Sequence, residues 1–255
     1  MKIRRRSLSV CRLIVIITIT LTLVNLAVGG DDQLMPRWFW ETPDVGGIHL
    51  AIGFAQSYVR NMEASYEEAF ADAAKRLYVD RGCRVTGERA QGSGPVGSFS
   101  LGEVAEFHTN ETGLDNFTQA VIHIDSVRCG KYIVVLVGTG MVDVDNKITP
   151  SPTVEKARKC LEENDLQACG SGTCRTSYYQ NLSWQEAERA ARIDAAYSIA
   201  SEVHHFRQKM DNQMVDVTVN KTDVAIAGYK TVGRALDKKN KQVWVFVEAI
   251  KEPLR

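Results

Sequence analysis

The chain has 255 residues, and its 31 basic and 31 acidic side chains give a formal net charge of zero. A protein that binds nucleic acid through its phosphates needs a net basic face, so this balance argues against that class of partner. Hydrophobic residues make up 44% of the sequence, which is enough for the packed core of one large or two small domains.

The first 29 residues have the pattern of a secretory signal. Lys2 and Arg4–Arg6 precede an apolar run over Leu13–Val28, and Ala27 and Gly29 supply the small side chains that a signal peptidase requires. We therefore predict an exported protein of the periplasm or cell envelope, with its mature part starting near residue 30. The alternative is an uncut anchor, although the run is short of the roughly 20 residues that cross a membrane.

Three consecutive aromatic residues, Trp38, Phe39 and Trp40, follow the signal. Pro36 and Pro43 bracket them and favour an extended backbone, in which alternate side chains face opposite ways. We expect both tryptophans to face the protein and Phe39 to be more exposed. The alternative is that the three form a contact surface for a membrane or a partner.

A strand over Ile48–Gln56 is followed by an alanine-rich helix. Ser65 and Glu68 have the spacing of a capping box at the start of that helix, and Gly82 is the expected stop. The apolar positions fall on one helix face and therefore predict packing against a sheet. They are Tyr66, Ala69, Phe70, Ala73, Ala74 and Leu77.

The same pattern occurs a second time. SYEEA at Ser65–Ala69 returns as SWQEA at Ser183–Ala187, preceded by a strand at Thr173–Gln180 and opening a helix from Trp184 to about Phe206. Each helix is followed by extended segments, with polar turns between them. These segments are Gln119–Asp125, Lys131–Val137, Gln213–Asn220 and Gln242–Ala249.

These elements predict an α+β protein of two tandem βαββ-type units, each with a helix packed on a small antiparallel sheet. The first unit spans residues 30–142 and includes the aromatic entry. The second spans residues 173–255. Residues 143–172 form a linker with a short helix near Thr153–Glu163, and the glycine-rich stretch Gln91–Gly102 is a flexible insertion.

The stretch from Pro36–Trp38 through Pro43 to Ile52–Ala55, followed by the alanine-rich helix, resembles the LPP20 family of bacterial envelope proteins. The resemblance covers mainly Pro36–Val85. It implies a dodecin-like βαββ fold, no enzyme activity and a role in the envelope. Those relatives usually carry a lipidated cysteine just after the apolar run. Here Cys11 precedes the run, so a lipoprotein is not predicted.

Five cysteines follow the signal: Cys83, Cys129, Cys160, Cys169 and Cys174. In an oxidising compartment they predict two disulfides and one free thiol. The spacing between Cys169 and Cys174 lacks the second pair or the histidines of a zinc site. The pairing stays open. The simplest set is Cys83–Cys129 and Cys169–Cys174 with Cys160 free, and a Cys83–Cys160 bridge is an alternative.

No catalytic, cofactor or metal site is predicted. His204 and His205 are adjacent on the expected helix, where they would point about 100° apart and could not easily share a metal. There is no Gly-x-Ser-x-Gly elbow, and the glycine-rich stretch lacks the Lys-Ser/Thr pair of a phosphate loop.

The sequence thus predicts an exported, non-catalytic envelope protein that acts through contacts with an envelope partner or with a second copy. It would touch a membrane only through an uncut N-terminal segment. Two alternatives remain: a periplasmic protein that binds a small ligand in the cleft between the two units, and a hydrolase with dispersed catalytic residues.

Overall fold

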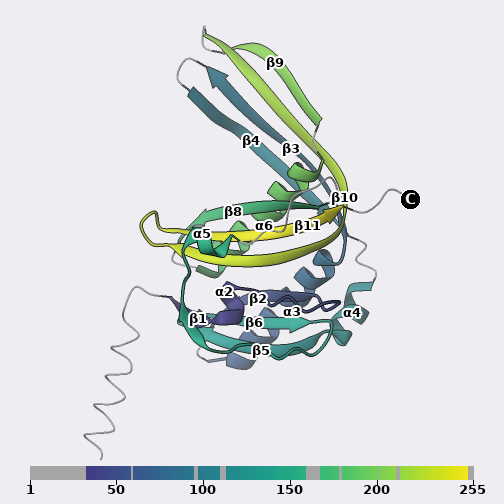
Figure 1. Cartoon of the computed structure of the whole chain (residues 1–255), viewed down its shortest axis with the longest axis vertical. Helices are drawn as coiled ribbons and strands as arrows, with labels where there is room; N and C mark the ends of the chain where they lie inside the picture. The colour runs from purple at the N-terminus through teal and green to yellow at the C-terminus, as the bar shows by residue number, and fades with distance from the viewer. Residues whose placement is uncertain are drawn as a thin grey trace, which may run out of the picture. The chain divides into compact units, whose positions relative to one another are not determined.

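The protein is described by a computed structural model over residues 33–58, 60–94, 97–109, 113–158, 167–177, 180–200, 202–210 and 213–251. It combines helices with antiparallel sheets, which confirms the predicted α+β class (Figure 1). The described residues from Met35 onward form one compact unit. No helix in the described ranges is both long and apolar enough to cross a membrane. The predicted signal, residues 1–29, lies outside them.

A three-stranded sheet carries the first alanine-rich helix. Its strand order is β2 (Leu50–Gln56), β6 (Tyr132–Gly138), β5 (Ile122–Cys129). Helix α3 (Met62–Asp80) lies on one face of it. The helix contributes small buried residues to this contact, and the strands contribute alanine, valine and isoleucine. The predicted strands and the apolar stripe of the helix therefore pack against each other, as the periodicity predicts.

The start of α3 differs from the prediction. Asn61 caps the helix by accepting a hydrogen bond from the N–H of Ala64 (3.2 Å), so the predicted capping box at Ser65 is wrong. Ser65 lies within the first turns, where its hydroxyl accepts from the N–H of Tyr58 (3.0 Å). Ser183 does the same in the second helix by accepting from the N–H of Ser177 (3.1 Å). Both serines thus tie the helix to the loop before it.

A six-stranded sheet contains the other long strands. Its order is β4-β3-β10-β11-β8, with β9 also paired to β10. The strands are β3 (Cys83–Gly94), β4 (Gly97–His108), β8 (Gln167–Arg175), β9 (Glu202–Met210), β10 (Gln213–Asp237) and β11 (Gln242–Lys251). Helix α6 (Gln180–Ile199) packs on β8 and β11.

Strand β10 is 25 residues long and has two different sets of neighbours. Its first part lies between β3 and β9, and Ile226–Asp237 pairs with β11. We call β4, β3, Gln213–Ile226 of β10, and β9 the arm. Figure 1 shows the arm's two hairpins side by side, extending away from α3 and α6.

Two predictions are wrong in the arm. The glycine-rich stretch Gln91–Gly102 was expected to be a flexible insertion, but its described residues lie in β3 and β4. Helix α6 was expected to reach Phe206, but it ends at Ile199, and residues 202–210 form β9. Pairing with β10 explains both outcomes, because strand formation depends on neighbours that a local pattern does not reveal.

The remaining elements are short. Strands β1 (Leu34–Pro36) and β7 (Ile148–Pro150) pair with each other. Helix α2 (Arg37–Trp40) follows β1, and α4 (Leu114–Ala120) precedes β5. The linker contains α5 (Val154–Ala157), which lies within the predicted helix near Thr153–Glu163.

Glycines let each long helix contact its sheet at backbone distance. A Cβ atom at Gly53 of β2 would overlap the backbone of Ala69 and Ala73 in α3. A Cβ atom at Gly172 of β8 would overlap the backbone of Ala187 and Ala191 in α6. The alanine spacing seen in the sequence therefore marks the positions where a strand glycine contacts the helix.

We expect Gly172→Ala to lower the free energy of unfolding by about 3 kcal/mol, because overpacking against rigid backbone typically costs 1–3 kcal/mol. Urea unfolding followed by circular dichroism measures the loss. Gly46→Ala is the control, since an added Cβ there meets no atom within 4 Å. Equal midpoints for the two variants would contradict the close helix–sheet contact.

Candidate functional site

The simplest predicted pairing, Cys83–Cys129 with Cys169–Cys174, is not found in the structure. Among the cysteines that the structure describes, none is at disulfide distance from another. Cys169 and Cys174 lie on the same strand, β8, whose extended backbone separates their Cα atoms by roughly 16 Å, whereas a bridge needs less than about 7 Å. Burial raises the pKa of the Cys83 thiol to about 12, so this thiol stays protonated. Cys160 lies outside the described residues.

The aromatic entry is part of the core, so both tryptophans face the protein as expected, and the alternative of a contact surface is wrong. Trp38, Phe39 and Trp40 are 1%, 0% and 3% exposed. They form a short helix rather than an extended segment, and Phe39 is as buried as the tryptophans. Its ring packs edge-on against Trp40 (4.9 Å between centroids) and Trp184 (5.2 Å). The helical turn directs Phe39 into this aromatic cluster, so it is not left on the outside.

The indole N–H groups fix the two tryptophans. Trp38 donates to the carboxylate of Asp125 (2.7 Å), and Trp40 donates to the carbonyl of Thr149 (3.0 Å). A buried indole needs such a partner. The three aromatics therefore stabilise the fold and do not offer a surface to a membrane or a partner.

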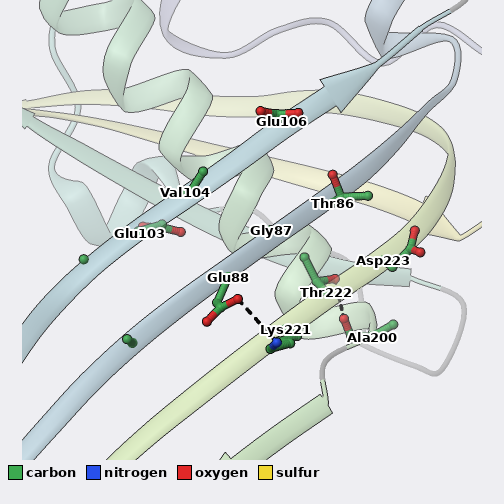
Figure 2. A pocket seen from close by; sticks show the side chains of 12 residues that line it. Thr86, Gly87, Glu88, Glu103, Val104, Glu106, Ala200, Lys221, Thr222 and Asp223 are labelled. Atoms are coloured by element: carbon green, nitrogen blue, oxygen red, sulfur yellow. Dashed lines mark hydrogen bonds and ion pairs between the residues drawn. The ribbon is translucent and has the colours of Figure 1, made fainter.

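A cavity of about 990 Å³ lies along the arm, where β3, β4 and β10 run side by side (Figure 2). Most of its charged lining residues pair with a residue on a neighbouring strand. Glu88 pairs with Lys221 (3.4 Å), and Glu103 pairs with Arg89 (3.0 Å). Figure 2 shows the Glu88–Lys221 contact between neighbouring strands.

A second exposed pair lies nearer the base of the arm. Arg84 donates two hydrogen bonds to Asp223 (2.6 and 2.7 Å), and this hydrogen bonding lowers the pKa of the carboxyl. Exposed pairs of this kind contribute little to stability, and their main effect is to favour one register of the strands. Apart from Glu106, whose neighbour is His108 on the same strand, the charged residues that line the cavity are therefore already paired. Within the described ranges, no group of three or more His, Cys, Asp or Glu side chains could hold a metal.

The outer edge of the arm is open at β4. Among the described strands, β4 pairs with β3 alone. Its sequence from Gly97 to His108 contains two glutamates, Glu103 and Glu106, but no lysine or proline, which are common protections of an edge strand against further pairing. Val104 on this strand is 68% exposed. Such an edge can accept an additional strand from another chain.

A buried charge cluster joins the two long helices below the arm. It consists of Arg76, Asp80, Glu188, Arg192 and Arg234. Glu188 contacts three guanidinium groups, those of Arg192 (2.7 Å), Arg76 (3.3 Å) and Arg234 (3.3 Å). Arg192 also donates two hydrogen bonds to Asp80 (2.9 Å each).

The two carboxylates of the cluster respond differently to burial. Burial alone would raise the pKa of Glu188, but the charges of Arg192, Arg76 and Arg234 hold it at about 2. Burial raises the pKa of Asp80 to about 6: the charge of Arg192 lowers it only in part, and the like charge of Glu188 adds to the rise. Glu188 is thus the firmly ionised centre of the cluster.

Sequence reasoning missed this cluster, although one signal was present. In the repeated helix, Glu188 occupies the place of Phe70, a position on the apolar stripe. An acidic residue at a core position requires a buried partner. Arg192 lies one turn further along the same helix, but Arg76 and Arg234 come from α3 and β10, far away in sequence, and could not be named from the pattern.

A smaller cavity of about 320 Å³ lies between α3 and α6, where the alternative of a small-ligand binder would place its ligand. Its arginines are already engaged. Arg76 pairs with Asp72 (3.0 Å) as well as with Glu188, and Arg189 donates to the carbonyl of Ala105 (2.9 Å). This cavity therefore does not favour ligand binding between the helices.

Comparison with known proteins adds no assignment. No protein-family model, no curated protein and no solved structure matches the chain.

We expect Glu188→Gln to destabilise the protein by about 3–5 kcal/mol, because removing one member of a buried ion cluster leaves buried charges without compensation. Glu186→Gln is the matched control, since Glu186 is exposed on the same helix and should change stability by less than about 0.5 kcal/mol. Thermal and urea unfolding measure both. Similar losses in the two variants would remove Glu188 from its central role.

Asp80 should make stability fall as pH rises from about 4 to about 6. Its folded pKa of about 6 lies above the ordinary value of 3.8, so the folded state binds the proton more tightly than the unfolded state. The loss can reach about 3 kcal/mol. Asp80→Asn should remove this slope, and Asp115→Asn, at an exposed position, should keep it. Urea unfolding at a series of pH values measures the slope, and an unchanged slope in Asp80→Asn would contradict the assignment.

Proposed function

We propose that this chain is an exported, non-catalytic protein of the periplasm or cell envelope that works through protein–protein contacts made by the arm. The observation that supports this most strongly is the open edge of β4, which contains no lysine, arginine or proline. Strand addition supplies affinity through main-chain hydrogen bonds and needs no catalytic group. The secretory pattern of residues 1–29 supports an exported location.

We further propose that the chain consists of two related βαββ-type units, each interrupted by a long hairpin. Strands β2, β6 and β5 have the same order in their sheet as β8, β11 and the later part of β10. The hairpin β3–β4 follows α3, just as β9 and the first part of β10 follow α6. The glycine–alanine contacts at Gly53 and Gly172 support the same correspondence.

A duplicated unit explains how the arm is built. Each copy contributes one hairpin, and the two hairpins pair through β3 and β10. Pairing them side by side leaves β4 and β9 as the two edges of the arm. The resemblance to the LPP20 family agrees with such units and with an envelope role, and it remains part of this proposal.

The partner is an envelope protein or a second copy of this chain. Val104→Lys tests the contact, because a lysine on an edge strand opposes further strand pairing. The side chain is exposed, so the fold should tolerate the change. Met141→Lys is the matched control: it places the same charge at an apolar position that is 72% exposed and lies outside the arm.

The measurement is chemical cross-linking in intact cell envelopes, followed by affinity purification and mass spectrometry. We expect the wild type and Met141→Lys to yield the same cross-linked species and Val104→Lys to lose it. If the species persists in Val104→Lys, the contact does not involve the edge of β4. If no variant yields any cross-linked species, the protein does not act through stable contacts.

A further inference from the structure

A cavity of about 470 Å³ lies between helix α2 and the linker, away from the arm. The apolar part of its lining, which we call the floor, includes Trp40, Pro150, Pro152 and Val232. This volume falls within the range of about 300–1,000 Å³ that is typical of small-molecule sites. Neither the aromatic core nor the arm accounts for a hollow of this kind.

Three cationic residues and one acidic residue line the cavity: Arg37, Lys147, Lys156 and Glu41. Arg37 is already shared between Glu41 (3.7 Å) and Asp145 (3.3 Å). Lys147 and Lys156 form no salt bridge within 4 Å in the part of the chain that the structure describes. The cavity therefore has an excess of positive charge above an apolar floor, part of which is offset by the carboxylate of Asp145 beside Arg37 and Lys147.

Hydrogen bonds hold the walls in place. The N–H of Arg37 donates to the carbonyl of Lys147 (2.9 Å), and Trp40 donates to the carbonyl of Thr149. Ser151 accepts from the N–H of Leu236 (2.7 Å), which fixes the linker against β10. The linker thus does not need to reorganise when a ligand enters, and preformed sites have a lower cost of binding.

We propose that this cavity binds a small organic anion, with its carboxylate at Lys147 and Lys156 and its apolar body against the floor around Trp40. A carboxylate fits better than a phosphate, because the fork-shaped guanidinium of Arg37 is engaged by two carboxylates and is not free for bidentate phosphate binding. The site is separate from the arm, so its failure or success leaves the proposed protein contacts untouched.

Benzoate is the probe, and benzamide is its neutral analogue of the same shape. Acetate tests the charge without the apolar body, and inorganic phosphate tests the other anion class. Isothermal titration calorimetry and thermal unfolding are carried out at constant ionic strength, since salt screens exposed charges. We expect benzoate to raise the melting temperature with concentration, as ligand linkage requires, and the other three probes to bind at least tenfold more weakly.

The double variant Lys147→Met/Lys156→Met should weaken benzoate binding at least tenfold. Lys75→Met/Lys239→Met removes the same charge from exposed positions elsewhere and should bind like the wild type. Covalent amine labelling read by mass spectrometry gives an independent measurement in the unmodified protein. Benzoate should protect Lys147 and Lys156 and leave Lys239 unchanged.

Three results would overturn the inference. Equal binding of benzoate and benzamide would show that charge is not recognised. Equal loss in the two double variants would show that the effect is non-specific. Labelling of Lys147 and Lys156 that benzoate does not reduce would place any bound anion elsewhere.

Discussion

The contact of Glu188 with three arginines joins the main elements of the described fold. Arg76 comes from α3, Arg192 from α6 and Arg234 from β10, so one carboxylate joins both long helices and the longest strand. Arg234 also donates to the carbonyl of Phe39, which brings α2 into the same cluster (3.2 Å). A buried ion cluster adds little net stability compared with apolar packing, but it penalises any arrangement that separates its members. Its contribution here is therefore to the specificity of the arrangement.

Helix α6, which contributes Glu188 and Arg192 to this cluster, also packs against the base of the arm. The residue after Arg192, Ile193, packs with Tyr197 and with Ala105 of β4. The guanidinium of Arg89 in β3 lies over the ring of Tyr197 (4.7 Å). The hydroxyl of Tyr229 donates to the carbonyl of Arg192 (3.1 Å), which ties β10 to the same helix turn. The charge cluster and the direction of the arm thus depend on a single helix.

How much the sequence predicts depends on where the partners of each residue lie. The alanine stripe of α3 and the buried strand Tyr132–Gly138 follow from local periodicity and are found in the structure. The arm does not follow from it, because β3 and β4 are rich in glycine and serine and become strands only through pairing with each other and with β10. A local pattern also cannot predict the burial of Phe39, since its neighbours Phe54 and Trp184 come from distant elements.

The two surfaces to which we assign roles differ in the chemical groups that form them. The edge of β4 is defined by backbone groups, so the identity of a partner's side chains matters less there than its ability to adopt an extended strand. The cavity beside α2 is lined by side chains, among them two lysines and an apolar floor, so the binding proposed there depends on the charge and shape of the ligand. Because the walls of that cavity come from α2 and the linker, which pack on the aromatic core, it can be occupied without moving the arm. A protein with these two surfaces can hold a macromolecular partner and a small anion at the same time, without one contact excluding the other.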